Sequence, residues 1–157
     1  MAVVKGRPLA TITAVDEGHF RKLERMYAAA PINAWFGPTL SVAEGAAEIR
    51  IPLRSEFHHA AGAVHGAVYF KALDDATFFA ASSVVQEVFV LTAHFEIDLL
   101  RPVVAGELRA VARVTERGER RILAEGDLFD GEGNIVARGR GSFAKSKIPL
   151  TPALNYA

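Results

Sequence analysis

The sequence predicts an α+β fold in which a curled antiparallel sheet of five to six strands wraps around one long central helix. Half of the 157 residues are hydrophobic, which suits one compact domain with a single core. Residues 65–85 are apolar on nearly every side, as expected of an enclosed helix. Later segments alternate apolar and polar residues, as antiparallel strands do. Since a flat sheet cannot cover a helix that is apolar all round, the sheet must curl around it.

The chain before the long helix predicts a surface helix and one strand. Phe20, Leu23 and Tyr27 recur at helical spacing, which predicts an N-terminal helix over about 16–30. Residues 47–53 then alternate, with apolar side chains on one face and charged side chains on the other. This alternation predicts the first strand of the sheet.

The long helix and the remaining strands follow in order. From His65 to about Val85 the chain is rich in alanine and phenylalanine and has no proline, which predicts one helix of about five turns. In residues 91–100, strict alternation places Phe95 on one face of a strand and Thr92 on the other. A glycine turn and the hairpin sequence DGEGN separate three further strands. These strands span 107–118, 118–129 and 135–146.

The ends of the predicted domain and the edges of its sheet complete the architecture. Residues 147–157 lack a periodic pattern and predict a loose C-terminal tail to a single domain of residues 1–157. A sheet of five or six strands leaves open edges, and pairing with a second copy is the usual remedy. We therefore expect at least a homodimer.

Composition excludes several classes of function. Eighteen basic residues balance eighteen acidic ones, so no global field attracts nucleic acid. The absence of cysteine rules out disulfides, thiolate metal sites and a cysteine nucleophile. The chain shows neither a signal peptide nor an apolar stretch long enough to span a bilayer. We expect a cytoplasmic protein that binds neither nucleic acid nor membrane.

The apolar helix carries two adjacent acids whose burial needs a reason. A buried carboxylate without a partner is costly, so it shifts its pKa or finds one. Asp74 and Asp75 are about 100° apart on a helix, so at most one of them faces a site. The other lies at an interface or pairs locally, and Lys71 is four residues from Asp75.

The start of the same helix offers an oxyanion site. The first N–H groups of a helix have no partner within it, and Gly66 has no side chain to keep an oxygen away. His65, just before it, is expected to anchor the loop and cap the helix. A carboxylate and a helix N-terminus that polarises a carbonyl are sufficient machinery for acyl transfer to water.

These residues carry a resemblance to a known family. HGAVYFKALDDA, which begins at His65, resembles the H-G-G-x-x-x-x-L-A-D-x-A signature of the hotdog-fold acyl-CoA thioesterases, in particular the phenylacetate-degradation (PaaI-like) type. The likeness covers about residues 35–146. It includes Thr92 followed at the family's spacing by Arg101-Pro102, and the glycine-rich last strand ARGRGSF.

The resemblance implies a hotdog fold and hydrolysis of an acyl-CoA thioester to the free acid and CoA. By similarity, Asp74 is the catalytic acid, acting as general base or nucleophile. The Gly66 N–H polarises the thioester carbonyl, and Thr92 assists from its strand. The family's sites lie between the two subunits of a homodimer; whether such dimers pair into a homotetramer is open. No cofactor is implied, because coenzyme A enters as part of the substrate.

Two positions depart from the family's pattern. The second glycine, at the substrate-binding start of the helix, is Ala67, which a helix tolerates. The loop asparagine or glutamine of the family is His59, which can orient the thioester, act as a base near neutral pH or protonate a leaving group. Arg138 and Arg140 are candidates for binding the CoA phosphates.

Other functions stay open at this point. A noncatalytic acyl-CoA-binding module or sensor has the same fold, and a hotdog enoyl-CoA hydratase or dehydratase uses a loop histidine with a helix acid, here His59 and Asp74. The histidines His58, His59 and His65 have no carboxylate at a familiar ligand spacing, so no metal site is predicted. Seven aromatic residues can either line an acyl pocket or fill the core: Trp35, Phe36, Phe57, Phe70, Phe78, Phe79 and Phe89.

Overall fold

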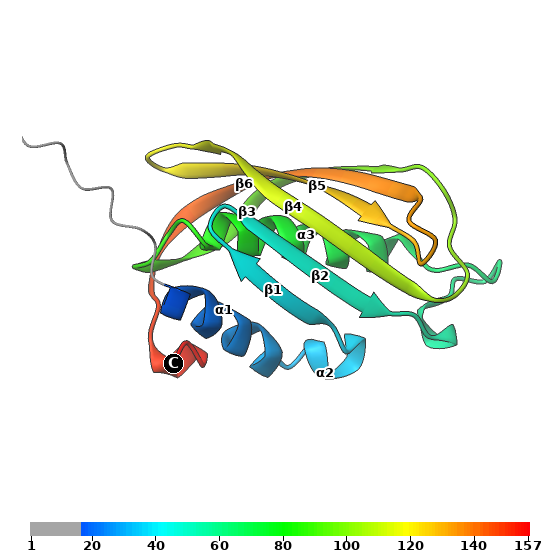
Figure 1. The fold of residues 1–157 in the computed structure, drawn as a ribbon, viewed down its shortest axis with the longest axis horizontal. Helices are drawn as coiled ribbons and strands as arrows, with labels where there is room; N and C mark the ends of the chain where they lie inside the picture. The colour runs from blue at the N-terminus through cyan, green and yellow to red at the C-terminus, as the bar shows by residue number, and fades with distance from the viewer. Residues whose placement is uncertain (1–16) are drawn as a thin grey trace, which may run out of the picture.

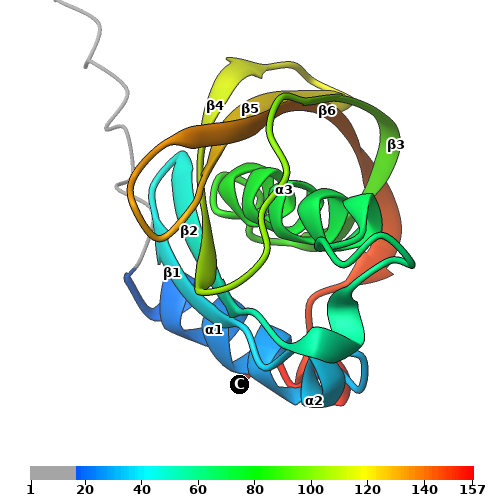
Figure 2. The same cartoon turned by 90° about the vertical axis from the view of Figure 1, so that its right-hand side faces the viewer.

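The computed structural model describes residues 17–157, in which one six-stranded antiparallel sheet curls around a long helix (Figure 1, Figure 2). The strand order is β1-β2-β4-β5-β6-β3. This arrangement confirms the predicted α+β hotdog fold. The helices are α1 (Glu17–Ala29), α2 (Asn33–Phe36) and α3 (Gly66–Ser82). The strands are β1 (Thr39–Ala43), β2 (Ala46–Pro52), β3 (Val88–Leu99), β4 (Glu107–Arg117), β5 (Arg121–Phe129) and β6 (Ile135–Pro149), with short 3₁₀ turns at Ser55–Phe57 and Pro152–Leu154.

The central helix α3 lies inside the curl, where the sheet approaches it closely. Leu73 is fully buried, and a Cβ built at Gly126 of β5 would lie 3.4 Å from its Cδ2 atom. The helix ends at Ser82, earlier than predicted, and the Ser83 hydroxyl accepts a hydrogen bond of 2.8 Å from the Gly45 N–H in the β1–β2 turn. Within residues 17–157, no helix has the length and apolar character needed to cross a membrane.

Two elements near the N-terminus were missed, whereas α1 matches the predicted helix over 16–30. Residue 16 lies outside the described residues. Strand β1 is a short edge strand with one buried side chain, Val42, so its sequence gives little alternation. Helix α2 has only four residues, too few for a periodic pattern.

The prediction of a loose C-terminal tail was wrong. Strand β6 continues to Pro149, and Leu150, Leu154 and Tyr156 then pack against the core. The Tyr156 hydroxyl hydrogen-bonds His19 Nδ1 of α1 at 2.6 Å. Because this partner lies 137 residues away in the chain, the local pattern of the tail carried no sign of it.

Candidate active site

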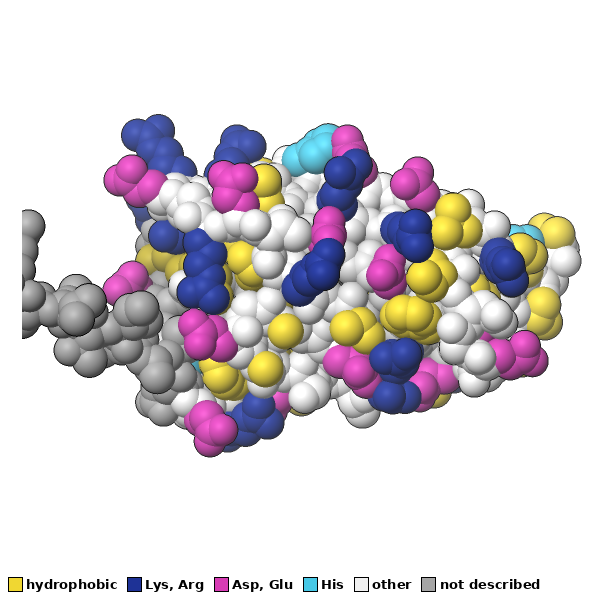
Figure 3. All heavy atoms as spheres, turned by 45° about the horizontal axis from the view of Figure 1, so that its top comes forward, with side chains coloured by type: hydrophobic (Ala, Val, Ile, Leu, Met, Phe, Trp, Pro, Cys, Tyr) yellow, Lys and Arg dark blue, Asp and Glu magenta, His cyan; other side chains and the backbone are white. Residues whose placement is uncertain are grey.

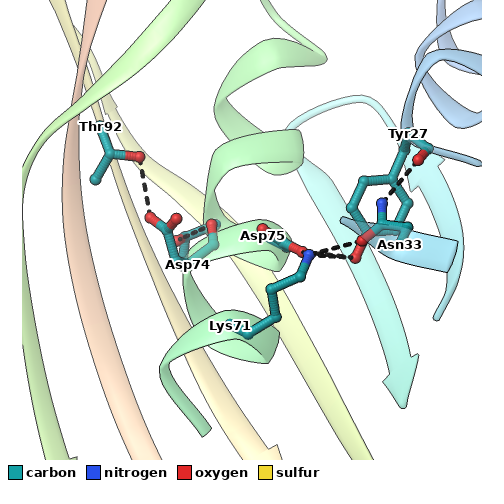
Figure 4. Close-up of polar contacts among 7 residues, drawn as sticks. Tyr27, Asn33, Lys71, Asp74, Asp75 and Thr92 are labelled. Carbon is teal, nitrogen blue, oxygen red and sulfur yellow. Dashed lines mark hydrogen bonds and ion pairs between the residues drawn. The ribbon is translucent and has the colours of Figure 1, made fainter. Parts of the chain in front are cut away.

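The two adjacent acids of α3 point in opposite directions (Figure 4). The Thr92 hydroxyl of β3 donates to Asp74 Oδ1 at 3.0 Å. Asp75 instead faces α1, where the Tyr27 hydroxyl donates to its Oδ2 atom at 2.6 Å. Only Asp74 therefore faces β3, in agreement with the expectation that the two acids cannot face the same place.

Asp75 belongs to a polar cluster that joins three helices. Its Oδ2 atom forms an ion pair with Lys71 Nζ, which also donates to Asn33 Oδ1 of α2 at 2.8 Å (Figure 4). Burial raises the pKa of Asp75, and the Lys71 charge and hydrogen bond oppose that rise. The predicted pairing of Lys71 with Asp75 is thus present, and it accounts for one of the two buried acids.

The environment of Asp74 suits a proton acceptor near neutral pH. Burial raises the pKa of Asp74 from 3.8 to about 6, while the hydrogen bond from Thr92 lowers it. The neighbouring Asp75 charge raises this pKa further, and the Lys71 charge lowers it. The carboxylate is mostly ionised at pH 7 yet close enough to neutrality to take up and release a proton.

Thr92 reaches Asp74 because β3 contains an irregularity. The pairing of β3 with β6 shifts register between Thr92 and His94. Such a bulge inserts one residue and re-aims the side chains before it. Strict alternation therefore failed at this residue: Thr92 lies on the α3 side of the sheet together with Phe95, not on the opposite face.

The first turn of α3 forms the predicted helix start. His65 caps the helix, since its Nδ1 atom accepts a hydrogen bond of 2.9 Å from the Ala67 N–H. The Ala67 N–H is therefore already hydrogen-bonded to the residue that caps its own helix. Gly66 is the first helical residue, so its N–H lacks a partner within the helix. A Cβ built at Gly66 would lie 3.1 Å from Leu99 Cδ1, so the glycine also leaves room for the Leu99 side chain of β3.

Asp74 and the helix start do not meet within one chain. Eight residues separate Gly66 from Asp74, which corresponds to about 12 Å along the helix axis. A thioester carbonyl is far too small to contact both groups. One chain therefore presents the Asp74 carboxylate and the start of α3 at separate places.

The loop histidines also lie apart from Asp74. His59 Nδ1 accepts a hydrogen bond of 3.1 Å from the Ala61 N–H, and His58 Nε2 pairs with the Val104 carbonyl at 2.7 Å. No hydrogen bond joins His59 to Asp74 in the described residues. Nor do three or more histidine, aspartate or glutamate side chains gather in residues 17–157 in a way that could hold a metal ion.

The two arginine candidates lie on the outer face of the sheet. Arg138 and Arg140 alternate along β6 with buried glycines that face the α3 side. Arg138 Nε donates to Asp127 Oδ1 at 3.1 Å, and Arg140 Nη2 donates to Glu96 Oε2 at 3.3 Å. Both line an open hollow of about 780 Å³. Side chains of both charges are spread over this face of the molecule (Figure 3). The sheet thus separates these arginines from Asp74 of the same chain.

Comparison with known proteins identifies the family. The model of the thioesterase superfamily matches residues 61–137, which include the start of α3, both acids and Thr92. Over these residues the chain belongs to the thioesterase superfamily. A curated relative from Saccharolobus solfataricus, named "Putative esterase SSO2140", is 25% identical over 132 residues, which cover 84% of this chain and 90% of that protein.

Solved structures share the fold of this thioesterase-superfamily chain. The conserved protein PA5202 from Pseudomonas aeruginosa is 29% identical, with a TM-score of 0.72, over 78% of this chain and 98% of that one. The E. coli PaaI protein from the phenylacetic acid degradation operon is 22% identical, with a TM-score of 0.79, over 88% and 100% of the two chains. At that identity the PaaI likeness concerns the fold.

Sequence reasoning missed Phe95, an aromatic residue of β3 that packs against the helix bearing Asp74. Phe95 was not among the seven aromatic candidates, yet its ring lies 5.1 Å from that of Phe70 on α3. The alternation of glycines in GRG, at Gly139 and Gly141, was the available signal. A run of two glycines inside a strand indicates that something approaches the backbone closely.

Proposed function

We propose that this protein hydrolyses acyl-CoA thioesters at sites assembled from two copies of the chain. The observation that carries the proposal is the Asp74 carboxylate, held by Thr92 and given a pKa of about 6 by burial. A carboxylate with these properties is suited to general-base or nucleophilic catalysis near neutral pH. Membership of the thioesterase superfamily supports thioester hydrolysis as the reaction.

Two features support a shared site. The helix start and Asp74 are about 12 Å apart along α3, so a second copy must bring its own Gly66 to the Asp74 of the first. In addition, β3 is an edge strand with unpaired backbone groups, and apolar side chains lie exposed along it and just after it. These side chains are Leu91, Leu99, Leu100 and Val104.

The proposed chemistry assigns a task to each residue. The second copy's Gly66 N–H donates to the thioester oxygen and stabilises the negative charge that develops there. Asp74 takes a proton from water, whose oxygen bonds to the carbonyl carbon; the C–S bond then breaks and CoA leaves as a thiolate that is protonated. Alternatively, the Asp74 carboxylate bonds to the carbonyl carbon, the C–S bond breaks and CoA leaves as a thiolate that is protonated; water then hydrolyses the resulting anhydride to the free acid and regenerates the carboxylate. Thr92 orients the carboxylate in either route.

The remaining candidate residues belong to the substrate side of the proposed site. His59 lies in the loop that leads into α3, so it accompanies Gly66, and in the proposed assembly it orients the thioester. Arg138 and Arg140 lie on the other face of the sheet from Asp74 of their own chain. We therefore propose that they bind the CoA phosphates of a substrate held at the Asp74 of another chain in the assembly. Coenzyme A enters and leaves with the substrate, and the reaction needs no further cofactor.

The test is release of free thiol from a panel of acetyl-, butanoyl-, decanoyl- and phenylacetyl-CoA. Asp74→Asn is expected to lose activity by about 10²-fold or more. The matched control is Asp98→Asn, since Asp98 is an exposed acid on β3, the strand that carries Thr92. Light scattering should give a mass of at least two chains.

Other results would replace the proposal. Binding of intact acyl-CoA without thiol release would identify an acyl-CoA-binding module. Loss of the conjugated double bond of an enoyl-CoA, with no thiol released, would identify a hydratase that uses His59 and Asp74. Full activity of Asp74→Asn would remove Asp74 from the site.

A further inference from the structure

One side of α3 bears the proposed catalytic acid between two phenylalanines. Phe70, Asp74 and Phe78 are spaced four residues apart, so they stack along the same side of the helix at steps of about 6 Å. The hydrogen bond from Thr92 shows that this side faces β3. A thioester bound at Asp74 must therefore direct its acyl group along this side of α3, toward one of the two rings.

The two rings differ in their accessibility. Phe78 pairs with Phe89 at 5.2 Å and also contacts the fully buried Phe143 at 6.0 Å, so this end merges with the core. Phe70 is 40% exposed and packs edge to face only 5.1 Å from Phe95 of β3. Because Phe70 is exposed and Phe95 is partly buried beside it, this aromatic pair near the proposed catalytic acid has surface available for a ligand. Of the two ends of this side of α3, the one at the Phe70–Phe95 pair is therefore the end that a ligand can reach.

Two glycines of β6 determine where the Phe95 ring lies. A Cβ built at Gly139 would lie 2.6 Å from Phe95 Cζ. One built at Gly141 would lie 3.0 Å from Phe95 Cδ2 and 2.5 Å from Cζ of the buried Phe143, so Gly141 makes room for both rings. The Phe95 ring therefore lies flat across both glycines, against the backbone of β6. Any side chain at Gly139 would force the ring off the sheet, toward α3 and Phe70. The glycines thus let the Phe95 ring lie against β6, farther from α3 than a side chain at Gly139 would allow.

We propose that Phe95, seated on Gly139 and Gly141, sets the size of the acyl group that this protein accepts. The Phe95 ring packs on Phe70, about one helical turn from Asp74, and so limits the length of acyl group that can lie along this side of α3. This limit favours short, compact acyl groups over long chains. The inference rests on the proposed function for the position of the thioester. It goes further in naming the residue that limits the acyl chain and the two glycines through which it acts.

The experiment measures binding and turnover separately. Dissociation constants are determined for non-hydrolysable thioether analogues of acetyl-, butanoyl- and decanoyl-CoA, and kcat/KM for the corresponding thioesters. The variants are Phe95→Ala, Gly139→Ala and the double variant. Phe129→Ala is the matched control, because Phe129 is a β5 aromatic that contacts Arg109 beside the outer hollow. Circular dichroism and light scattering establish that each variant keeps the wild-type fold and mass.

Phe95→Ala is expected to improve decanoyl binding relative to acetyl binding by about tenfold or more, since removal of the ring admits further methylene groups. Gly139→Ala should weaken butanoyl binding relative to acetyl binding by about tenfold. The double variant should match Phe95→Ala, because without the ring Gly139→Ala has nothing to displace. Phe129→Ala should keep the wild-type profile.

Three results would overturn the inference. One is an unchanged chain-length profile in Phe95→Ala, and another is a Gly139→Ala effect that persists in the double variant. The third is dissociation of Phe95→Ala into single chains, which would make Phe95 an interface residue. Failure of the proposed function would look different, because the wild-type protein would then release no thiol. The dissociation constants of the thioether analogues would still test the role of Phe95.

Discussion

Replacing Asp74 by asparagine is expected to stabilise the fold at alkaline pH while it removes the proposed base. Burial raises the pKa of Asp74 from 3.8 to about 6. An acid whose pKa is higher in the folded state binds its proton more tightly when folded. Its contribution to stability is therefore present below pH 3.8 and is lost as the pH rises through about 6. Above that range, the ionised carboxylate destabilises the fold.

The size of this effect follows from the two pKa values. The difference between 3.8 and about 6 corresponds to about 3 kcal/mol. Because Asp74 is partly exposed, solvent screening reduces the expected value to about 1.5 kcal/mol. Asparagine cannot ionise, yet its carbonyl can still accept the hydrogen bond from Thr92. For a domain of this length, the gain corresponds to a rise in Tm of about 3–6 °C.

The assay is thermal unfolding of the wild-type protein and Asp74→Asn at about pH 8 and at about pH 4, followed by circular dichroism. The variant should melt higher at the alkaline pH, and the difference should nearly vanish at the acidic pH. The control Asp98→Asn, at an exposed site, should show no such dependence. An Asp74→Asn variant that melts below the wild type at about pH 8, or gains equally at both values, would refute the reasoning.

Three further predictions concern the surroundings of the site. Thr92→Val removes the hydrogen bond that lowers the pKa of Asp74, so the rise of kcat/KM with pH, near 6 in the wild type, should move to higher pH; Thr92→Ser should preserve it. Asp75→Asn leaves the Lys71 charge buried without its partner, at a cost of about 3 kcal/mol, and should lower Tm by about 6–12 °C. Deletion of residues 150–157 removes three partly buried apolar side chains and should lower the free energy of unfolding by about 2–4 kcal/mol, as measured by urea titration.

The parts of the fold that were predicted are those with a local, periodic signal. The apolar run that became α3 and the alternating runs of β4, β5 and β6 contain enough residues for a pattern to emerge. Strand β1 has five residues and one buried side chain, so nothing in its sequence distinguishes it from a loop. The C-terminal residues pack through contacts with α1 and the core, and such distant partners leave no periodic trace.

The choice between the two acids of α3 shows a second limit. Helix geometry alone establishes that Asp74 and Asp75 diverge, and the spacing to Lys71 indicates a partner for Asp75. The remaining partners of Asp75 are Tyr27 and Asn33, which come from helices that the tertiary fold brings to α3. Because these contacts satisfy Asp75, the acid left facing β3 is Asp74. Family resemblance reached the same residue by its motif.

For Thr92, the alternation of the sequence and the family motif predicted opposite faces of the strand. Alternation assigned it to the face opposite Phe95, whereas the family motif assigned it to the site. In a regular strand Thr92 and Phe95 would lie on opposite faces. The register shift between Thr92 and His94 instead places both side chains on the α3 side, so the alternation was misleading and the family motif was right about the face. A bulge costs ladder hydrogen bonds, so a fold retains one where it serves a purpose. Here the bulge turns the Thr92 hydroxyl toward Asp74, while Phe95, three residues later, still packs against Gly139 and Gly141. The bulge thus lets one edge strand contribute both the orienting group and the proposed size limit of the site.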